Sequence, residues 1–267
     1  MPVNDELGKR IKRYEAVPQI SLMRRTPVII RIDGKAFHTF TKGLQRPWDN
    51  ILRTAMDNTM MRLAAEIQGC FFAYNQSDEI TLVLQDFETL TTDAWFGYEV
   101  EKLCSISASM ATLYFNQEFR KLAEREIWDY HHSMVPQSME LQQEVNKYHD
   151  TLRNCINKGA LFDARCFNVP REEVVNTVYW RQLDAVRNSI QSCGQYYFSH
   201  KELHKKNTKD ILEMLKQKGI SWETSPICVQ RGTACYKTEE GWVLDKNMPM
   251  LKGDGRRYLE DLIPMVD

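Results

Sequence analysis

The sequence predicts an α+β fold, in which a mixed β-sheet carries helices on one face, as in ferredoxin-like and polymerase-palm folds. The run "TPVIIRID" at 26–33 is rich in β-branched residues and indicates a buried strand. Apolar residues recur every three or four positions over 48–68, as on one face of a helix that ends at Gly69. Two short apolar runs, "CFFAY" and "ITLVL", flank the polar "NQSDE" and predict a β-hairpin.

Helices are expected on either side of these elements. Before the first strand, Leu7, Ile11 and Tyr14 fall near one face of a short helix over 5–16. After the hairpin, residues 94–115 are rich in Ala, Ser and Leu and predict a closely packed helix. The polar stretch 125–150 carries Pro136 and three histidines, and we expect a loop that leads into a helix.

The C-terminal half predicts a strand, two helices and a hairpin. The segment "ALFDARCFNVP" at 160–170 is typical of a strand closed by Pro170. Helices are expected over 171–193 and 208–220, ended by Gly194 and Gly219. The alternation in "GTACYKTEEGWVLDKN" predicts a hairpin that turns near "EEG". Since no repeat or linker interrupts the chain, we expect a single unit, with a palm core at about 5–170 and a helical and hairpin portion at about 171–267.

The composition favours a globular cytoplasmic protein. Apolar residues make up 43% and charged residues 27% of the 267 residues, and no apolar run reaches the roughly 18 residues of a membrane span. The seven cysteines form no C-x-x-C pair, which favours reduced thiols over a zinc site. The net charge of −1 means that any nucleic-acid partner must bind a local positive surface.

Carboxylates follow two of the predicted strands. Asp33 ends the first strand, and Asp78 and Glu79 lie in the turn of the hairpin. If the strands are neighbours, like charges meet at one edge of the sheet, which is costly unless a cation lies between them. Magnesium ions suit such a site and, as a pair, catalyse phosphoryl or nucleotidyl transfer. Gly34 could offer a carbonyl to an ion, and the N–H groups of 35–38 could bind a triphosphate.

Simpler interpretations stay open for several residues. Asp33 could begin a D-G turn and Asp78 could cap the hairpin. His131, His132 and His149 are expected in an exposed loop rather than at a metal, because no acid accompanies them at ligand spacing. The helical cysteines Cys104 and Cys193 are expected to be small core residues, and a packing role is as plausible as a chemical one for Arg165, Trp180, Arg181 and Gln182.

Beyond spacing, four motifs resemble the histidine tRNA guanylyltransferase family. The strand "RIDGKAFHTF" and the hairpin "YNQSDEITLVL" match its R-hydrophobic-D-G-x-x-F-H and Q-S-D-E motifs. Further on, "FDARCFNVP" and "YWRQLDAVRNSI" resemble its F-D-x-R and W-R-Q-x-D segments. The motifs occur in the family order over roughly 5–240. The resemblance implies a palm that adds nucleotides in the 3′-to-5′ direction.

The resemblance also implies a set of site residues. Two Mg²⁺ ions would be held by Asp33, the Gly34 carbonyl and Asp78, with Glu79 as an adjacent acid of less defined role. Ser77 would lie beside the metal, and Lys102 near the nucleotide, although a solvated surface lysine is the simpler interpretation of Lys102. The triphosphate of ATP or GTP would contact, largely through backbone, Lys35, Ala36, Phe37 and His38.

One departure from the family pattern narrows the expected activity. Where the guanylyltransferases carry H-I-N-N after W-R-Q-x-D-x, this chain has "VRNS" at 186–189, and Glu99 falls near an expected arginine. This resembles the guanylyltransferase-like branch, which repairs 5′-truncated tRNAs under the direction of a template. The alternative is a histidine tRNA guanylyltransferase that adds G at position −1.

The branch implies a two-step reaction and several partners. A 5′-monophosphate RNA end attacks the α-phosphate of ATP, and the 3′-hydroxyl of an incoming nucleotide then displaces AMP. The expected partners are tRNA and further copies of the chain, which by family resemblance would form a tetramer. No membrane partner is expected. The basic stretches "HKELHKKNTK" at 200–209 and "KGDGRR" at 252–257 are candidates for RNA contact, although such charges are often merely solvated.

Two rival functions stay open. A palm-fold nucleotide cyclase also uses acids on adjacent strands, but "QSDEI" lacks the G-G-D-E-F pattern typical of those enzymes. An RNA-binding or assembly module without catalysis is disfavoured by the intact acids at 33, 78 and 79.

Overall fold

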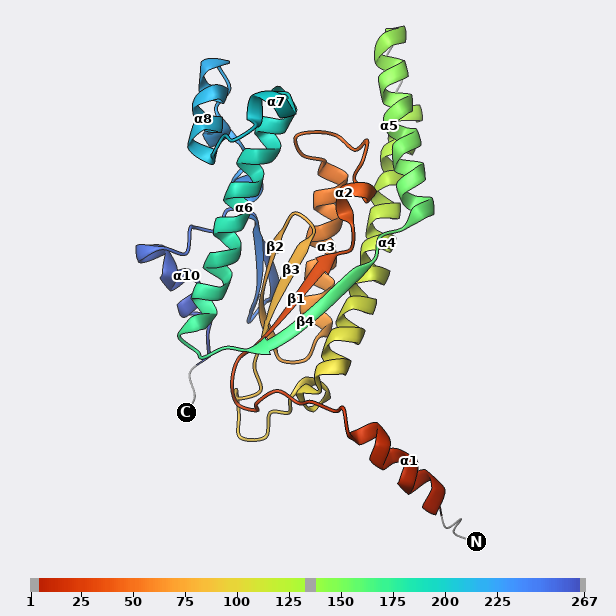
Figure 1. Ribbon diagram of the computed structural model, residues 1–267, viewed down its shortest axis with the longest axis vertical. Coiled ribbons are helices and arrows are strands. Elements are labelled where there is room, and N and C mark those ends of the chain that lie inside the picture. Colours follow the sequence, from red (N-terminus) through yellow and green to blue (C-terminus); the bar gives the residue numbers. More distant parts are fainter. Residues whose placement is uncertain (1–4, 133–137, 265–267) are drawn as a thin grey trace.

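The computed structural model describes residues 5–132 and 138–264 of the chain (Figure 1). Its centre is a six-stranded sheet in which each strand runs antiparallel to its neighbours. The α+β, ferredoxin-like class is therefore confirmed, although the sheet is antiparallel where a mixed one was expected. In spatial order the strands are β4 (Phe162–Asn168), β1 (Val28–Gly34), β3 (Glu79–Leu84), β2 (Cys70–Gln76), β5 (Thr233–Thr238) and β6 (Gly241–Asp245).

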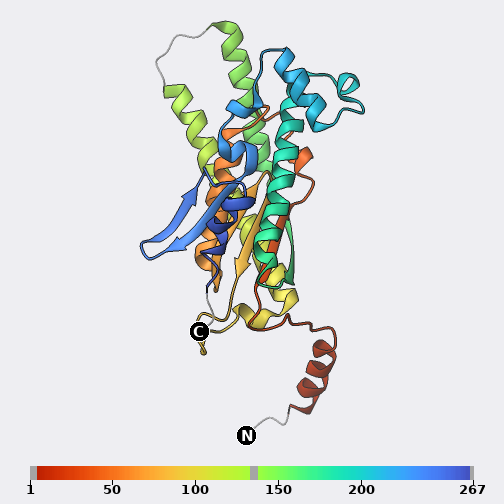
Figure 2. The same ribbon diagram turned by 90° about the vertical axis from the view of Figure 1, so that its left-hand side faces the viewer.

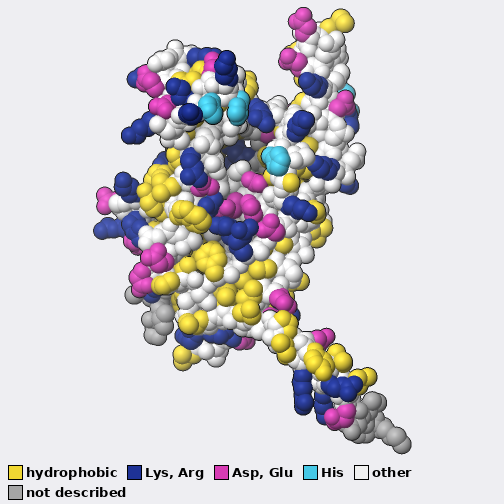
Figure 3. Space-filling model, in the orientation of Figure 1, with side chains coloured by type: hydrophobic (Ala, Val, Ile, Leu, Met, Phe, Trp, Pro, Cys, Tyr) yellow, Lys and Arg dark blue, Asp and Glu magenta, His cyan; other side chains and the backbone are white. Residues whose placement is uncertain are grey.

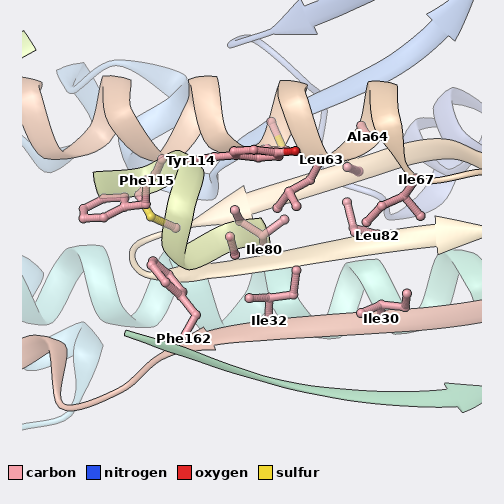
Figure 4. Packing of buried hydrophobic residues seen from close by; sticks show 14 of the residues in the cluster. Ile30, Ile32, Leu63, Ala64, Ile67, Ile80, Leu82, Tyr114, Phe115 and Phe162 are labelled. Carbon is pink, nitrogen blue, oxygen red and sulfur yellow. The ribbon is translucent and has the colours of Figure 1, made fainter. Parts of the chain in front are cut away.

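Two long helices, α3 (Asn50–Glu66) and α4 (Val100–His132), cover one face of the sheet (Figure 1). Side chains alternate along a strand, so Ile30 and Ile32 of β1 both point to this face and are fully buried there. Burial of this apolar face is the main stabilising contribution to the fold. Figure 4 shows part of this core, including Leu63, Ala64, Ile67, Ile80, Leu82, Tyr114, Phe115 and Phe162.

The opposite face of the sheet is covered by the C-terminal part of the chain. Ile29 points to this side and belongs to a second core with Val178 of α6 (Glu173–Tyr197) and Leu259 of α10 (Arg257–Glu260). The predicted hairpin forms as β5 and β6, and β5 pairs with β2 to extend the same sheet. Helices therefore cover both faces, and the expectation of helices on one face is wrong because it left out the C-terminal helices.

The N-terminal helix α1 (Glu6–Ala16) forms where the apolar spacing predicts it. Its N-terminus is capped by Asp5, whose carboxylate accepts a hydrogen bond from the Gly8 N–H at 2.7 Å. The helix projects away from the body of the protein and buries none of its residues (Figures 1 and 2).

The helix after the hairpin differs from the prediction at both ends. It begins at Val100 rather than 94, because Phe96, Gly97 and Tyr98 adopt positive φ angles in a short 3₁₀ segment, η1 (Trp95–Tyr98). It continues to His132, so residues 125–132 are helical rather than a loop, and α5 (Met139–Lys158) follows. Pro136 lies outside the described residues. In the described ranges, no helix has the length and apolar character needed to cross a membrane.

Gly194 lies inside α6 and does not end it. A Cβ at this position would come within 2.7 Å of Cγ2 of Ile211, so the glycine allows α8 (Thr208–Gln217) to pack closely on α6. The predicted end of α8 is confirmed, because Gly219 follows it with a φ of +75°. The remaining short elements are α2 (Phe37–Phe40), α7 (His200–Leu203), η2 (Trp222–Thr224), α9 (Ile227–Arg231) and η3 (Gly253–Arg256).

Candidate functional site

The two acidic strand ends meet at one edge of the sheet. In the antiparallel register of β1 and β3, Asp33 lies opposite Glu79. The Gly34 N–H donates a hydrogen bond to the Asp78 carbonyl at 3.1 Å, which ties the end of β1 to the β2–β3 turn. The turn is tight, and Ser77 adopts a positive φ of 53° to complete it. The structure therefore brings together the three predicted acids from two separate segments of the chain.

Asp78 lies in an environment that disfavours its charge. Burial raises the pKa of the Asp78 carboxyl, and the nearby charge of Asp33 raises it further, while a hydrogen bond from Ser77 opposes the shift. The described residues give Asp78 no ion pair. Two carboxylates that repel each other in this way form a natural position for a cation.

Glu79, which follows Asp78 directly, is also buried but has cationic partners. Its carboxylate accepts a hydrogen bond from Nε of Arg181 at 2.6 Å, and Nε of Arg31 lies 3.9 Å away. Burial raises the pKa of Glu79, but both arginines oppose that shift. Arg181 also binds Asp184 at 2.7 Å, so Glu79 joins β3 to α6 through a buried ionic network.

The W-R-Q-x-D segment of α6 serves mainly to join elements. The guanidinium of Arg181 stacks on the ring of Trp180, 4.4 Å from its centroid. The Gln182 side chain donates to the Pro249 carbonyl and accepts from the Leu251 N–H, both at 2.8 Å, which holds the C-terminal segment. For Arg181 and Gln182 the packing interpretation is confirmed, while Trp180 remains about half exposed. Arg165 pairs with Asp163 at the surface.

The loop after Asp33 is held down by an aromatic cluster. The Phe37 ring lies 5.1–5.5 Å from the rings of Phe40, Phe115 and Phe162. The Lys35 N–H donates to the Leu161 carbonyl at 2.8 Å, so it is not free to bind a phosphate as the sequence suggested. For the next three residues, no backbone partner of the N–H group is found among the described residues; these are Ala36, Phe37 and His38.

A cavity of about 370 Å³ opens beside these residues. His38 and Ser77 line it on the side of the carboxylates, and Asn188 and Ser189 of α6 line another side. Arg46 and Arg53 add positive charge to its wall. Its volume lies in the range of pockets that bind small ligands.

Sequence reasoning missed the residues that shape this cavity. The key residue is Asp49, the N-cap of α3, which is buried and accepts hydrogen bonds from the Gln45 N–H at 3.0 Å, the Leu52 N–H at 2.9 Å and the Tyr148 hydroxyl at 2.8 Å. The motif "RPWDN" could have signalled a helix start, but not that this start borders a pocket.

The donor set at the carboxylates fits magnesium rather than a metal held by protein ligands alone. In the described part of the chain, no group of three or more His, Cys, Asp or Glu side chains is arranged to hold a metal. Two carboxylates and a backbone carbonyl leave the other positions to water and phosphate, which is how Mg²⁺ is usually bound. Since no lysine or arginine of the described residues pairs with Asp78, its carboxylate is available to such an ion.

Lys102 does not lie near this site. It is in the first turn of α4, where it pairs with Glu99 at 2.8 Å. Cys104, two residues on, contacts Cys166, which pairs with Ile30 near the middle of β1. Ten residues further along α4, about 15 Å, Thr112 reaches Phe162 at the carboxylate end. The structure therefore does not support the predicted nucleotide contact of Lys102 within one chain.

The three histidines lie on helices, not in an exposed loop. His131 and His132 are exposed at the end of α4, as expected of surface histidines. His149 is buried on α5, where its ring packs on Tyr130, and neither of its nitrogens has a hydrogen-bond partner among the described residues. Burial lowers the pKa of His149, which favours its neutral form as a core residue.

All seven cysteines are free thiols, which agrees with the reading of the composition. Cys193 is a buried core residue as predicted, whereas Cys104 is only partly buried and lies 3.6 Å from the sulfur of Cys166.

Comparison with known sequences identifies the family. A sequence model of the family "tRNAHis guanylyltransferase" (Thg1) matches residues 8–170. An uncharacterized protein of Acanthamoeba polyphaga mimivirus is 27% identical over 247 residues, which cover 88% of this chain and 78% of the viral protein. The tRNA(His) guanylyltransferase of Candida glabrata is 24% identical over 88% of this chain and 94% of its own length. The chain spans 38% of tRNA(His) guanylyltransferase 2 of Arabidopsis thaliana.

Solved structures share the architecture. A bacterial tRNA(His) guanylyltransferase (Thg1)-like protein in complex with ATP superimposes with a TM-score of 0.80 and 36% identity, over 97% of this chain and 100% of that one. A bacterial Thg1-like protein in complex with GTP superimposes with a TM-score of 0.75 and 32% identity, over 98% of this chain and 100% of that one. The tRNA(His) guanylyltransferase of Saccharomyces cerevisiae has the same fold, with a TM-score of 0.61 and 19% identity over 88% of this chain and 93% of that one. The resemblance seen in the motifs is confirmed: the chain belongs to the tRNAHis guanylyltransferase family.

Proposed function

We propose that this chain is a magnesium-dependent nucleotidyltransferase that adds nucleotides in the 3′-to-5′ direction to the 5′ end of truncated tRNA, directed by the opposite strand. The observation that carries the proposal is the meeting of Asp33 and Asp78 beside the 370 Å³ cavity. The likeness to bacterial Thg1-like proteins solved with ATP and with GTP supports nucleoside triphosphates as substrates.

Asp33, the Gly34 carbonyl and Asp78 are the proposed ligands of two Mg²⁺ ions. When bound, these ions supply positive charge against the phosphates and lower the pKa of the attacking hydroxyl. Glu79 is the third acid of the site, and we assign it a positioning role. Its pairing with Arg181 fixes the first residue of β3, and with it the turn that presents Asp78.

The nucleotide is proposed to bind with its phosphates on the loop after Asp33 and its base toward the cavity. The N–H groups of Ala36, Phe37 and His38 donate to the triphosphate, as oriented backbone dipoles do in anion sites. Lys35 contributes its exposed side chain, because its N–H is already bound to Leu161. Ser77 lines the cavity next to Asp78 and orients the same nucleotide.

The reaction follows in two displacements. An oxygen of the RNA 5′-monophosphate attacks the α-phosphorus of ATP and pyrophosphate leaves, which gives an adenylylated 5′ end. The 3′-hydroxyl of the incoming nucleotide then attacks the RNA phosphate, loses its proton and displaces AMP. The site residues position the attacking and leaving oxygens in line, and positioning with charge stabilisation supplies most of the catalysis in phosphoryl transfer.

The template-dependent branch is favoured over addition of G at position −1. The "VRNS" stretch replaces the H-I-N-N of the guanylyltransferases, and two of its residues, Asn188 and Ser189, line the cavity. Side chains at this wall contact the bound nucleotide or the RNA end, so their replacement changes which end is accepted. Addition of a single G to histidine tRNA is the second candidate, and a palm-fold cyclase the third.

We further propose that the palm core of about 5–170 and the C-terminal portion of about 171–267, which carries RNA contacts and assembly, act as one catalytic unit. The pairing of β5 with β2 and the Glu79–Arg181 bond join the two portions next to the site. A homotetramer and a cytoplasmic location stay predictions from the family.

The test is extension of a 5′-truncated, monophosphorylated tRNA with each labelled nucleoside triphosphate and Mg²⁺. We expect the added nucleotide to follow the base opposite, and to change when that base is changed. Asp33→Ala should abolish extension while leaving the unfolding temperature nearly unchanged, since a partly exposed acid at the end of a strand contributes little packing. Addition of G regardless of the opposite base would instead favour the second candidate, and a cyclic nucleotide product the third.

A further inference from the structure

A second hollow, about 590 Å³ in volume, lies where α6 ends and α7 and α8 begin. It is lined by His200, His204, Lys205 and Lys206. Lys201 of α7 and Lys209 of α8 are also exposed. Figure 3 shows Lys, Arg and His side chains gathered over this end of the molecule. The chain as a whole carries a net charge of −1, so this is a local concentration of positive charge.

These lysines are not neutralised by the carboxylates around them. In the described ranges, no carboxylate lies within ion-pair distance of Lys201, Lys205, Lys206 or Lys209. The two nearest acids in sequence cap helices instead. Glu202 accepts from the Ser199 N–H at 2.8 Å, and Asp210 accepts from the Asn207 N–H at 3.0 Å.

In the other basic candidate, 252–257, one of the three basic side chains is bonded within the fold. The guanidinium of Arg256 donates to Glu260 at 3.0 Å and to Asn176 at 2.8 Å, so it holds η3 against α6. Lys252 and Arg257 of this segment have no ion pair among the described residues, so it offers two unpaired cations. The α7–α8 region offers four, namely Lys201, Lys205, Lys206 and Lys209.

The lysine-lined hollow and the cavity beside the carboxylates are neighbours on α6. Gln195 of α6 lines both of them. Arg181, which binds Glu79, and Gln195 are fourteen positions apart on α6, a rise of about 21 Å. An A-form RNA duplex rises about 3 Å per base pair, so roughly seven base pairs behind a 5′ end held at the carboxylates would reach the lysines.

We propose that the α7–α8 surface binds the phosphate backbone of the double-stranded RNA stem behind the reacting 5′ end. The inference rests on the proposed function for the position of that end, but the binding surface is testable by itself. Duplex RNA fits because its evenly spaced phosphates match unpaired lysines without any need for base contacts.

The experiment compares two 5′-monophosphorylated RNA hairpins with the same end sequence, one with a stem of three base pairs and one of twelve. Binding to the full chain is measured by fluorescence anisotropy over a range of salt concentrations. The test variant combines Lys201→Gln, Lys205→Gln, Lys206→Gln and Lys209→Gln. A matched control neutralises four exposed lysines elsewhere, namely Lys9→Gln, Lys12→Gln, Lys121→Gln and Lys237→Gln.

We expect the test variant to bind the long hairpin about 10-fold more weakly at low salt. Its slope of log K against log salt should be shallower by about 2–4, given a slope of roughly 0.9 per phosphate contact. Binding of the short hairpin and of ATP should be unchanged, and so should all binding by the control. An equal loss for both hairpins, an equal loss in the control, or a change of oligomeric state in sedimentation would overturn the proposal.

The same data separate the two hypotheses. If the wild-type protein binds the long hairpin through these lysines but extends neither RNA, the binding surface stands and the proposed reaction falls. If extension is templated but the lysine variant binds and extends the long hairpin like the wild type, the reaction stands and the surface falls.

Discussion

Asp78 and Glu79 are consecutive residues beside the same aspartate, and burial raises the pKa of both, yet among the described residues only Glu79 has cationic partners. Asp78 faces the charge of Asp33 without a paired cation among the described residues, and burial and that charge raise its pKa. Glu79 is held by Arg181 at 2.6 Å, with Arg31 at 3.9 Å. A buried carboxylate without a partner in the protein is stabilised by a proton or by a cation from outside, whereas a paired carboxylate joins two elements of the fold. Adjacent acids of one motif therefore have different tasks.

The largest effect is expected from Asp78→Asn. The change removes a proposed metal ligand but keeps the shape of the turn, so nucleotide addition should fall by about 10³-fold, in the range seen when one group that stabilises a transition state is lost. The free energy of unfolding should stay the same or rise, because a carboxylate with a raised pKa destabilises the fold at neutral pH. Single-turnover extension and urea unfolding check the two parts.

Metal binding supplies the control for this variant. Mg²⁺ with ATP should raise the unfolding temperature of the wild type and of Glu79→Gln, but not that of Asp78→Asn, since a ligand stabilises only the folded state that binds it. An equal rise in all three proteins would contradict the assignment of Asp78 as a ligand.

The next effect is on stability, from Glu79→Gln. Removing one partner of a buried ion pair leaves the other uncompensated, and Asp184 relieves Arg181 only in part. We expect a loss of about 2–3 kcal/mol in the free energy of unfolding, measured in urea, and a loss of activity smaller than that of Asp78→Asn. The double variant Glu79→Gln, Arg181→Met should recover part of the stability, because the unpaired charge is gone.

A smaller effect should appear in the pH dependence of stability. The native pKa of Asp78 lies above its ordinary value of 3.8, so between these two values the native state holds a proton that the unfolded state has released. The wild type should therefore lose stability relative to Asp78→Asn as the pH rises through this interval, and the difference should level off above it. Unfolding curves between pH 3 and pH 8 test this, and a constant difference would contradict it.

The smallest effect is expected from Lys102→Ala. Its side chain is half exposed, and its one ion pair among the described residues is with Glu99, three residues before it, so the cost should be at most about 0.5 kcal/mol. Activity should stay within about 2-fold of the wild type. A larger loss of activity would mean that Lys102 reaches a site on another copy of the chain or on the RNA.

The elements near the site were predictable from the sequence because local signals specify them. The β-branched run of β1 and the polar turn between β2 and β3 fix two strands, and the antiparallel register then places Asp33 opposite Glu79. The pairing of Glu79 with Arg181, 102 residues away, has no local signal. The same holds for the cavity wall, which Asp49 and α6 form only after the chain has folded.

The misplaced helix boundaries have local causes that the hydrophobic pattern does not reveal. Positive φ angles at Phe96 and Tyr98 delay the start of α4, and neither residue type favours that conformation. Gly194 suggested a helix end, but its small size serves the contact with Ile211. A glycine can therefore mark either the end of a helix or a close contact between two helices, and the sequence pattern alone does not distinguish the two.

The close contact at Gly34 links the aromatic core to the chemistry of the site. A Cβ at Gly34 would lie 2.2 Å from the Phe37 ring, and that ring is fixed by three other phenylalanines. We therefore expect the packing of these rings to help fix the position of the Gly34 carbonyl, the proposed metal ligand. Smaller side chains in that cluster would shift the Gly34 carbonyl oxygen without changing any polar residue of the site. Activity could therefore be lowered by substitutions in the apolar core alone.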